Sequence, residues 1–443
     1  MDHFRQFMRG MPNQISVPTV KMILQMNPPT AARALMNDLT RPLKHQLPYI
    51  KKVHGGAWRG AWIGENMHTA DSYEDVKARV QKADLIIFTI HGGGFRIGTS
   101  TMYMKAYTTW IEMLKDNGIH AIIMSVKYRL SPELMLFLFQ AKYPEPTEDC
   151  VRAYQHLRNS LKVPGNKIVV TGDSAGGALL FETMMDCHAP DVYDHLGGEN
   201  ATGAIESKGY PDLPAAMMLS SPLVTEKFDA PSWKANDKHD IVTTKFAKQV
   251  LREYFDPEVA PTPETMKVLA LSRMDKGFEV FIPKNVIVYV GKKEVMRDDI
   301  LELCDRVKRN STINVQVIQE NLVHDWYMIR DLVKKKSILE QNDRVFIRFI
   351  KQALEQAQGH PIRGSAQFKE VRSRQGRKAS MSESFVSCSS VNSSSAQTAL
   401  ESSLAAETEL IETLSQVGSH KDRRSTSSEA PIASPTILGL ITV

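Results

Sequence analysis

The chain has 443 residues and a formal net charge of +5 at pH 7, and apolar residues make up 42% of it. This apolar content is enough for a sizeable buried core, and no run approaches the roughly 18 apolar residues that a membrane-spanning helix needs. The charge is mild for this length and no basic stripe alternates with aromatic residues, so no nucleic-acid partner is indicated. We therefore expect a soluble protein.

Targeting and redox signals are sparse. Residues 1–6 lack the apolar stretch of a signal peptide, so we expect an intracellular location, cytoplasmic or peripheral to a membrane. Four cysteines are present, none paired at a spacing typical of a metal site: Cys150, Cys187, Cys304 and Cys388. We expect reduced thiols, no metal and no organic cofactor.

In chain order, the N-terminal segment is predicted to be helical and the middle of the chain alternates strands with helices. Residues 1–55 lack strand periodicity and suggest helices over 20–26 and 31–39. The strand candidates further along are 84–90, 120–127, 166–171, 214–220, 285–290 and 313–319. Their alternation with helical patterns predicts a parallel sheet. A long insertion at 222–280 includes a helical stretch with one apolar face.

The C-terminal part of the chain differs in composition from the rest. After Leu354 it becomes polar and rich in serine, as in residues 387–395. Such sequence buries too little apolar surface to offset the entropy lost on ordering. We expect residues 358–443 to form a disordered tail.

The most informative motif is GDSAGG at residues 172–177, which directly follows the β-branched run 168–170. A strand that leads into G-x-S-x-G and then into a helix is typical of a nucleophile elbow. The turn places the hydroxyl of Ser174 on a strained corner that only small neighbours such as Gly172 and Gly176 allow. We predict that Ser174 is a nucleophile.

A second glycine-rich motif, HGGGF at residues 91–95, follows the strand-like run 85–90. Glycines let main-chain N–H groups approach a substrate oxygen, which is what an oxyanion hole requires. We predict that three N–H groups form this hole: those of Gly93, Gly94 and Ala175. His91 and Gly92 are expected to be structural, with His91 bracing the loop by hydrogen bonding.

Together these motifs resemble a known family. HGGGF, then YRLSPE at residues 128–133, then GDSAGG resemble the signatures of the hormone-sensitive-lipase-like branch of the α/β-hydrolases. The resemblance covers about residues 56–357. It implies an α/β fold with a mostly parallel eight-stranded sheet flanked by helices and a helical cap over the site. The implied parts are N-terminal cap helices in 1–55, a catalytic domain in 56–357 and a cap insertion at 222–280.

A serine nucleophile needs an imidazole that takes its proton and a carboxylate that orients the imidazole. In α/β-hydrolases the chain order is serine, acid, histidine. Six histidines come after Ser174: His188, His195, His239, His324, His360 and His420. Only His324 lies just after the last strand candidate, so we predict His324 as the general base.

The acid is predicted in the loop that follows the strand candidate 285–290. The family pattern is an acid, two residues, a basic or polar residue and another acid, which places Glu294 at the catalytic position. Family members more often have aspartate there, but the triad accepts either acid. Asp298 is the alternative, although Asp298 and Asp299 are better suited to the positive end of the following helix.

These residues predict a serine ester hydrolase, carboxylesterase-like or lipase-like, that acts on small apolar esters through an acyl-enzyme. The apolar run 134–139 has three interpretations: it lines an acyl or alcohol pocket, lies against a membrane, or extends a packed helix. This run, the glutamate at the acid position and the tail resemble fungal members of the branch, some of which deacetylate sterols.

Two other functions are open at this point. One is a catalytically silent receptor or scaffold that binds a small apolar ligand, although such members of the branch typically lack the histidine that is present here as His324. The other is an acyltransferase or amidase, which would share the acyl-enzyme.

Overall fold

The computed structural model describes residues 13–131, 142–190, 212–255, 266–272 and 274–361. The chain divides into two units, Met1–Phe368 and Lys369–Val443, and every described residue belongs to the first. Two predictions fall outside the described residues: the apolar run 134–139, and the tail beyond residue 361.

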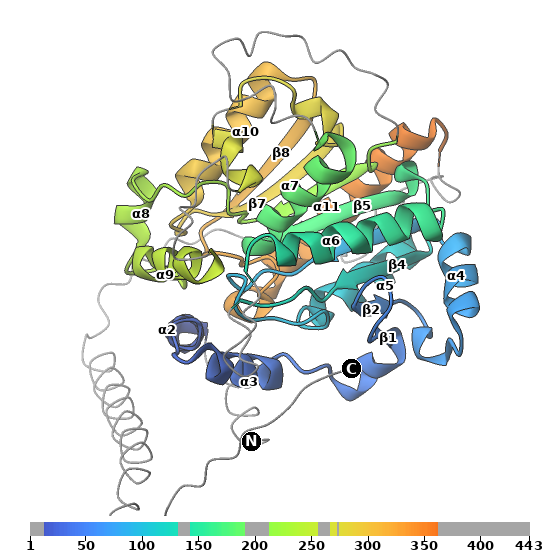
Figure 1. The fold of residues 1–443 in the computed structure, drawn as a ribbon, viewed down its shortest axis with the longest axis horizontal. Coiled ribbons are helices and arrows are strands. Elements are labelled where there is room, and N and C mark those ends of the chain that lie inside the picture. Colours follow the sequence, from blue (N-terminus) through green and yellow to red (C-terminus); the bar gives the residue numbers. More distant parts are fainter. Residues whose placement is uncertain (1–12, 132–141, 191–211, 256–265, 273, 362–443) are drawn as a thin grey trace, which may run out of the picture. The chain divides into compact units, whose positions relative to one another are not determined.

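An eight-stranded sheet forms the centre of the described unit, with strand order β1-β2-β4-β3-β5-β6-β7-β8 (Figure 1). The pairs β1–β2 and β2–β4 are antiparallel, and all other neighbouring pairs are parallel. The strands are β1 Ile50–Val53, β2 Gly60–Ile63, β3 Leu85–Ile90, β4 Ala121–Val126, β5 Ile168–Asp173, β6 Ala216–Ser220, β7 Asn285–Gly291 and β8 Asn314–Glu320. The predicted mostly parallel sheet is confirmed.

The apolar runs explain why six of the eight strands are recognisable in the sequence. Every residue of β3, β4 and β5 is buried. Parallel strands that are covered on both faces consist of nearly continuous apolar residues. The two strands without a prediction, β1 and β2, have four residues each, and β1 contains Lys51 and Lys52. Neither shows the long apolar run.

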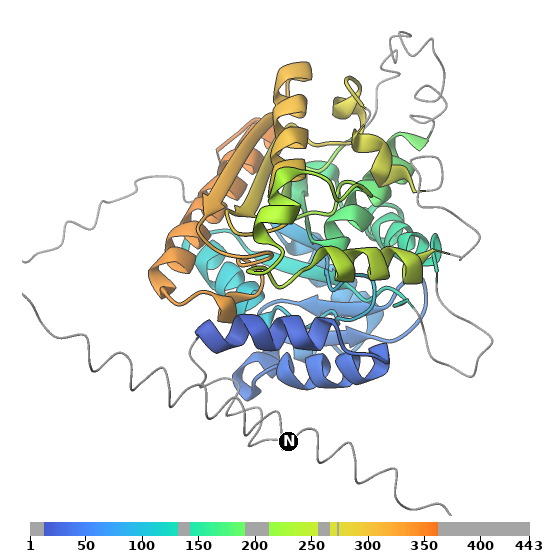
Figure 2. The same ribbon diagram turned by 90° about the vertical axis from the view of Figure 1, so that its left-hand side faces the viewer.

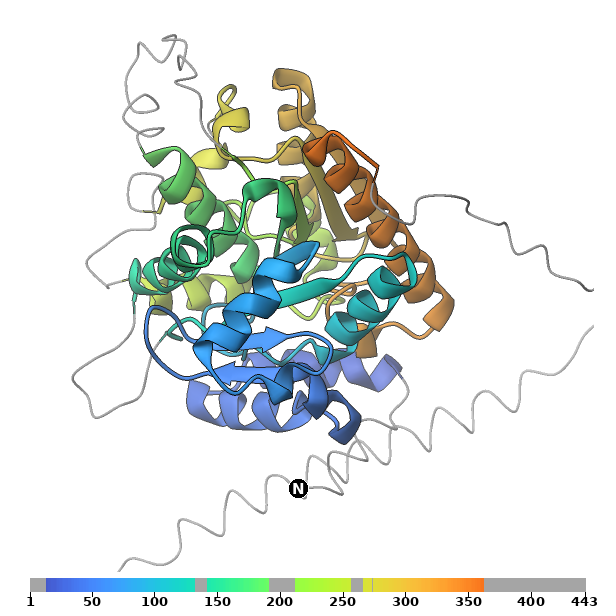
Figure 3. The same cartoon turned by 90° about the vertical axis from the view of Figure 1, so that its right-hand side faces the viewer.

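Helices cover both faces of the sheet. They are α2 Asn13–Leu24, α3 Pro29–Leu39, α4 Tyr73–Lys82, α5 Met104–Asp116, α6 Glu145–Gln155, α7 Ala175–His188, α8 Pro231–Asn236, α9 Thr244–Tyr254, α10 Arg297–Asn310 and α11 Lys336–Gln358. Figure 3 shows α11 in orange and α5 in turquoise on one side, and α6 and α7 in green on the other. Among the described residues, no helix is both long and apolar enough to cross a membrane.

Alternate residues of each central strand belong to the two cores. In β3, Ile86 and Phe88 belong to the core that contains residues of α4, α6, α7 and α10. Leu85 and Ile87 belong to the core that contains residues of α5 and α11. Successive side chains of a strand point to opposite faces, so this division is the one expected for a sheet between two helical layers.

The N-terminal helices α2 and α3 lie beside the insertion that carries α8 and α9, as Figures 1 and 2 both show. Lys21 Nζ donates to the carbonyl of Asp237 at 2.8 Å, and Gln25 Nε2 donates to Thr243 Oγ1 at 3.2 Å. The prediction of a helix over 20–26 was wrong at both ends, because α2 begins at Asn13 and ends at Leu24. Pro28 and Pro29 follow shortly after this end, and the helical conformation is disfavoured for a residue that precedes proline.

Arg96 connects the N-terminal helices to α9 of the insertion. Its side chain is 2% exposed, and its guanidinium donates to the carbonyl of Leu24 at 3.2 Å and to Asn27 Oδ1 at 3.0 Å. It also forms an ion pair of 2.6 Å with Glu253 of α9. A buried charge is tolerated only when it is paired and hydrogen-bonded. Arg96 therefore links the loop after the HGGG motif to the N-terminal helices and to α9.

We expect Arg96→Ala to lower the free energy of unfolding by about 3 kcal/mol, because an ion pair and two hydrogen bonds are lost in a buried place. Urea unfolding followed by circular dichroism would measure it. Lys115→Ala is the control, since Lys115 pairs with Glu65 at the surface, and we expect a change below about 1 kcal/mol. Equal effects of the two variants would contradict the role of Arg96.

Candidate active site

Ser174 lies at the sharp turn between β5 and α7. Its backbone has φ 48° and ψ −120°, and its N–H donates to the carbonyl of Ser220 at 2.9 Å. A non-glycine residue in the left-handed region is strained and persists only where its surroundings hold it. A Cβ on Gly176 would lie 2.3 Å from the carbonyl oxygen of Ile90, and one on Gly172 would lie 2.6 Å from that of Gly176. Both positions therefore require glycine.

The structure brings His324 to Ser174 although 150 residues separate them. The Ser174 hydroxyl is hydrogen-bonded to His324 Nε2 at 2.9 Å. His324 follows β8, is 2% exposed, and burial lowers its pKa to about 3. The imidazole is therefore neutral at neutral pH, which is the form that accepts a proton from a hydroxyl.

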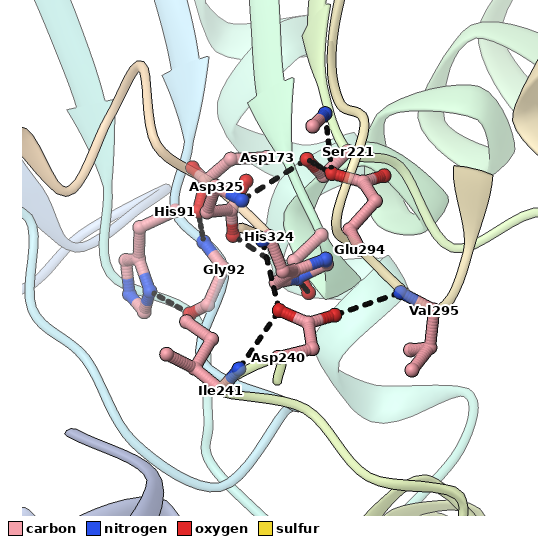
Figure 4. Close-up of polar contacts among 12 residues, drawn as sticks. His91, Gly92, Asp173, Ser221, Asp240, Ile241, Glu294, Val295, His324 and Asp325 are labelled. Carbon is pink, nitrogen blue, oxygen red and sulfur yellow. Dashed lines mark hydrogen bonds and ion pairs between the residues drawn. The ribbon is translucent and has the colours of Figure 1, made fainter. Parts of the chain in front are cut away.

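Glu294 lies in the loop after β7 and is completely buried, close to His324 in Figure 4. Its Oε2 accepts hydrogen bonds from Ser221 Oγ at 2.6 Å and from the backbone N–H of Gly291 at 2.9 Å. Its Oε1 and the Nδ1 of His324 have no hydrogen-bond partner among the described residues. The structure therefore contains no hydrogen bond between His324 Nδ1 and Glu294 Oε1, which a triad needs, and the assignment of Glu294 as the acid stays a prediction.

Asp298 and Asp299, the other acids of this loop, lie in the first turn of α10. Asp298 Oδ2 accepts from the backbone N–H of Ser232 at 2.8 Å, and Asp299 Oδ2 accepts from Trp233 Nε1 at 2.8 Å. Both carboxylates therefore hold α8 against the start of α10. These contacts explain the position of Asp298 without assigning it a role in the triad.

The N–H groups predicted as oxyanion donors lie around the cavity that contains Ser174. Gly93 and Gly94 have φ of 103° and 60°, and their N–H groups donate to no other residue that the structure describes. Ala175 is the first residue of α7, where a backbone N–H has no acceptor within the helix. Three main-chain donors are thus available to a ligand oxygen beside the serine.

A buried network supports the glycine-rich loop. Asp173 Oδ2 accepts from the N–H of Gly92 at 2.9 Å and from the hydroxyl of Tyr103 at 2.5 Å. His91 Nδ1 donates to the carbonyl of Gly92 at 2.8 Å, and its ring stacks on Tyr128 with 4.5 Å between centroids. Burial lowers the pKa of His91 to about 4. These contacts are those of a neutral brace, the role that we predict for His91.

Some residues of this site carry no signal in the sequence. Tyr103 supports Asp173 from α5, and Ser221 bonds to Glu294 from the loop after β6. Asp240, in the insertion, accepts from the backbone N–H of His324 (Figure 4). None of the three belongs to a recognisable motif. Each is recognisable only from its position in the folded chain.

An apolar cavity opens onto Ser174 and His324. It encloses about 700 Å³ of space between atoms, part of it open to solvent. Three helices, α2, α3 and α9, form part of its wall through Val20, Leu24, Met36, Phe246, Val250 and Leu251, and loop residues form most of the rest. Such a cavity, with a few polar groups at one end, is typical of a small-molecule site. Within the described part of the chain, no cluster of three or more His, Cys, Asp or Glu residues is arranged to hold a metal.

Comparison with known proteins identifies the fold family. A family model described as an alpha/beta hydrolase fold matches residues 87–328, more than half of the chain. An esterase of Acinetobacter venetianus is 26% identical over 231 residues, which are 51% of this chain and 62% of that protein. Hormone-sensitive lipase of Bos taurus is 33% identical over 125 residues, 27% of this chain and 15% of the lipase. The matched part is less than two thirds of either relative.

Solved structures show the same fold. The crystal structure of a hormone-sensitive lipase from a metagenome library aligns with a TM-score of 0.55 and 18% identity over 78% of this chain and 99% of that one. The chain therefore belongs to the α/β-hydrolase fold family, and part of it is similar to hormone-sensitive lipase.

The buried carboxyls around His324 predict how stability depends on pH. Burial raises the pKa of Asp173 and Asp240 to about 7, and burial together with the charge of Asp240 raises that of Glu294 to about 8. Between its ordinary pKa and its raised pKa, each group binds more protons in the folded state than in the unfolded state. The free energy of unfolding therefore falls as pH rises toward 8.

Buried histidines with lowered pKa values act in the opposite direction, but only below about pH 6.5. We therefore expect the unfolding temperature to fall between pH 7 and pH 8.5. Differential scanning fluorimetry, in buffers whose pH changes little with temperature, would measure the unfolding temperature. Glu294→Gln, which cannot ionise, should show a smaller fall, and an unfolding temperature that rises over this range would contradict the prediction.

Proposed function

We propose that this protein is a serine carboxylic ester hydrolase with Ser174 as nucleophile, His324 as general base and Glu294 as the acid that orients His324. The observation that carries the proposal is the 2.9 Å hydrogen bond between Ser174 Oγ and His324 Nε2 at the end of an apolar cavity. The names of the relatives, esterase and hormone-sensitive lipase, support ester hydrolysis.

In the acylation step, Ser174 Oγ attacks the ester carbonyl carbon while His324 Nε2 takes the hydroxyl proton. The carbonyl oxygen becomes an oxyanion, and the N–H groups of Gly93, Gly94 and Ala175 stabilise it. These donors act on charge that develops only in the tetrahedral intermediate, so losing one costs on the order of 3 kcal/mol in the barrier. His324 then protonates the departing alcohol, which leaves an acyl group on Ser174.

In the deacylation step, water attacks the acyl-enzyme and His324 again takes the proton. The second tetrahedral intermediate collapses with release of the carboxylic acid, and the proton returns to Ser174 Oγ. Glu294 completes the mechanism when its Oε1 accepts a hydrogen bond from His324 Nδ1. Support comes from the two atoms themselves, because buried polar atoms without partners are rare and each lacks one here.

The cavity favours apolar esters as substrates. Its polar side chains are Ser174, His324, Asp325 and Tyr103, and the remaining lining is hydrophobic side chains and glycines. Each buried CH₂ of a ligand contributes about 0.8 kcal/mol. The similarity to fungal enzymes that deacetylate sterols stays a prediction and adds sterol acetates to the candidates. A silent receptor is less well supported, because the serine and histidine of a hydrolytic pair are hydrogen-bonded.

We expect Ser174→Ala and His324→Ala to lower kcat by at least about 1,000-fold, since each removes a group that transfers a bond or a proton. Glu294→Gln keeps the shape but cannot carry the negative charge that stabilises the imidazolium, so we expect a loss of at least about 100-fold above pH 8, where Glu294 is ionised. Hydrolysis of p-nitrophenyl butyrate by the full chain would measure all three. Asp298→Asn is the matched control and should stay within about twofold of wild type. Full activity of Ser174→Ala would disprove the mechanism.

A second test addresses the cavity. Ala247 of α9 lines it and is 6% exposed, so Ala247→Phe would fill space that a long chain needs. We expect kcat/KM for p-nitrophenyl octanoate to fall by about tenfold or more relative to the acetate, because the added ring excludes several methylene groups. Ala34→Phe, on the exposed side of α3, is the control and should leave this ratio unchanged. If the ratio of kcat/KM for octanoate to that for acetate were the same in both variants, the acyl chain would bind outside this cavity.

A further inference from the structure

Asp240 is a completely buried carboxylate, and among the residues that the structure describes its hydrogen-bond donors are backbone N–H groups. Its Oδ1 accepts from His324 at 2.9 Å and from Ile241 at 2.8 Å, and its Oδ2 accepts from Val295 at 2.8 Å (Figure 4). A carboxylate in this environment is costly to bury and is satisfied by these three donors. The arrangement joins residues that lie 55 and 84 positions away in the sequence.

The three donors belong to the parts that the proposed reaction needs. His324 is the general base, and Val295 directly follows the acid Glu294. Ile241 lines the substrate cavity and precedes α9, which forms one of its walls. One carboxylate thus connects the base, the loop that carries the acid, and the insertion that covers the site.

The loop around His324 depends on such side-chain acceptors because it is not part of a helix or strand. The N–H of Asp325, which has φ 56°, donates to Ser221 Oγ at 3.0 Å. The N–H of His324 itself donates to Asp240. Both successive backbone donors at the base are therefore held by side chains, one from the loop after β6 and one from the insertion. Moving either acceptor would move the imidazole relative to Ser174.

We propose that Asp240 is a positioning residue, which holds the backbone of His324 and of the Glu294 loop so that the imidazole reaches Ser174. The inference rests on the proposed function. Asp240 touches neither the substrate carbonyl nor the reacting atoms, so its effect passes through His324. A displacement of about 1 Å at a catalytic group lowers turnover by on the order of 100-fold.

Two substitutions separate the contacts. Asp240→Ala removes all three acceptors. Asp240→Asn keeps an oxygen at Oδ1 for His324 and Ile241 but places an N–H₂ group against the N–H of Val295. The asparagine variant therefore retains the contact to the base and loses the contact to the acid loop. Asp299→Asn is the matched control, because Asp299 also anchors the insertion, through Trp233, without contact to His324.

The experiment compares these three variants and wild type as full-length chains. One readout is kcat and KM for p-nitrophenyl acetate, which is too small to depend on the apolar walls. The other is the rate at which an alkyl p-nitrophenyl phosphonate labels Ser174, which reports activation of the nucleophile without turnover. We expect Asp240→Ala to lower kcat and the labelling rate by about 100-fold, with KM changed less than threefold. Asp240→Asn should recover about tenfold of that loss, and Asp299→Asn should stay within about twofold of wild type.

Circular dichroism and thermal unfolding show whether each variant folds, and Asp240→Asn decides the question if Asp240→Ala does not. A folded asparagine variant with the kcat and labelling rate of Asp299→Asn would overturn the proposal. Failure of the proposed function gives a different result: wild type itself would neither hydrolyse the ester nor react with the phosphonate, and the role of Asp240 would fall with it.

Discussion

The close approach of the nucleophile turn to the end of β3 is the constraint on which the rest of this site depends. Gly176 lies so near the carbonyl of Ile90 that a Cβ would stand 2.3 Å from that oxygen. This contact places the start of α7 beside the glycine-rich loop, so Ser174 and the main-chain donors face one cavity. The strained φ of Ser174 is the cost, and the tightly packed sheet around it maintains the turn.

Four buried carboxyls lie in this site, and their grouping affects its stability. Asp173, Asp240, Glu294 and Asp325 all lie within the buried centre around His324, and burial raises the pKa of each. Grouping them is unfavourable for folding, because their charges are desolvated and repel one another. These four carboxyls place negative charge near the imidazole of His324 when they are ionised.

The cavity walls and the catalytic groups are connected through the N-terminal helices and the insertion. Arg96 links the loop after the HGGG motif to α2 and α9, while Asp240 links the insertion to His324. The helices that line the apolar cavity are thus fixed to the glycine-rich loop and to the loop that contains His324.

Much of the fold and part of the site could be predicted from local sequence. The apolar runs of β3 to β7 and the glycine motifs around Gly93 and Ser174 are contiguous, and each reflects a local requirement of buried strands or tight turns, whereas β8 alternates polar and apolar residues. The position after the last strand predicted His324 as the base, and the structure places His324 in hydrogen-bond contact with Ser174. The strands β1 and β2 were not recognisable, because four-residue strands with two lysines in one of them lack an apolar run.

The sequence by itself determined the class of fold, the elbow and the candidate serine and histidine, because backbone sterics and the burial of apolar strands act over a few neighbouring residues. Only the tertiary structure decided that Arg96 contacts α2 and α9, that Asp240 binds the backbone of His324, and that Asp298 binds α8. These roles are hydrogen bonds between single side chains and distant backbone groups, and no periodicity or motif in the chain records which donor a buried carboxylate or guanidinium will meet.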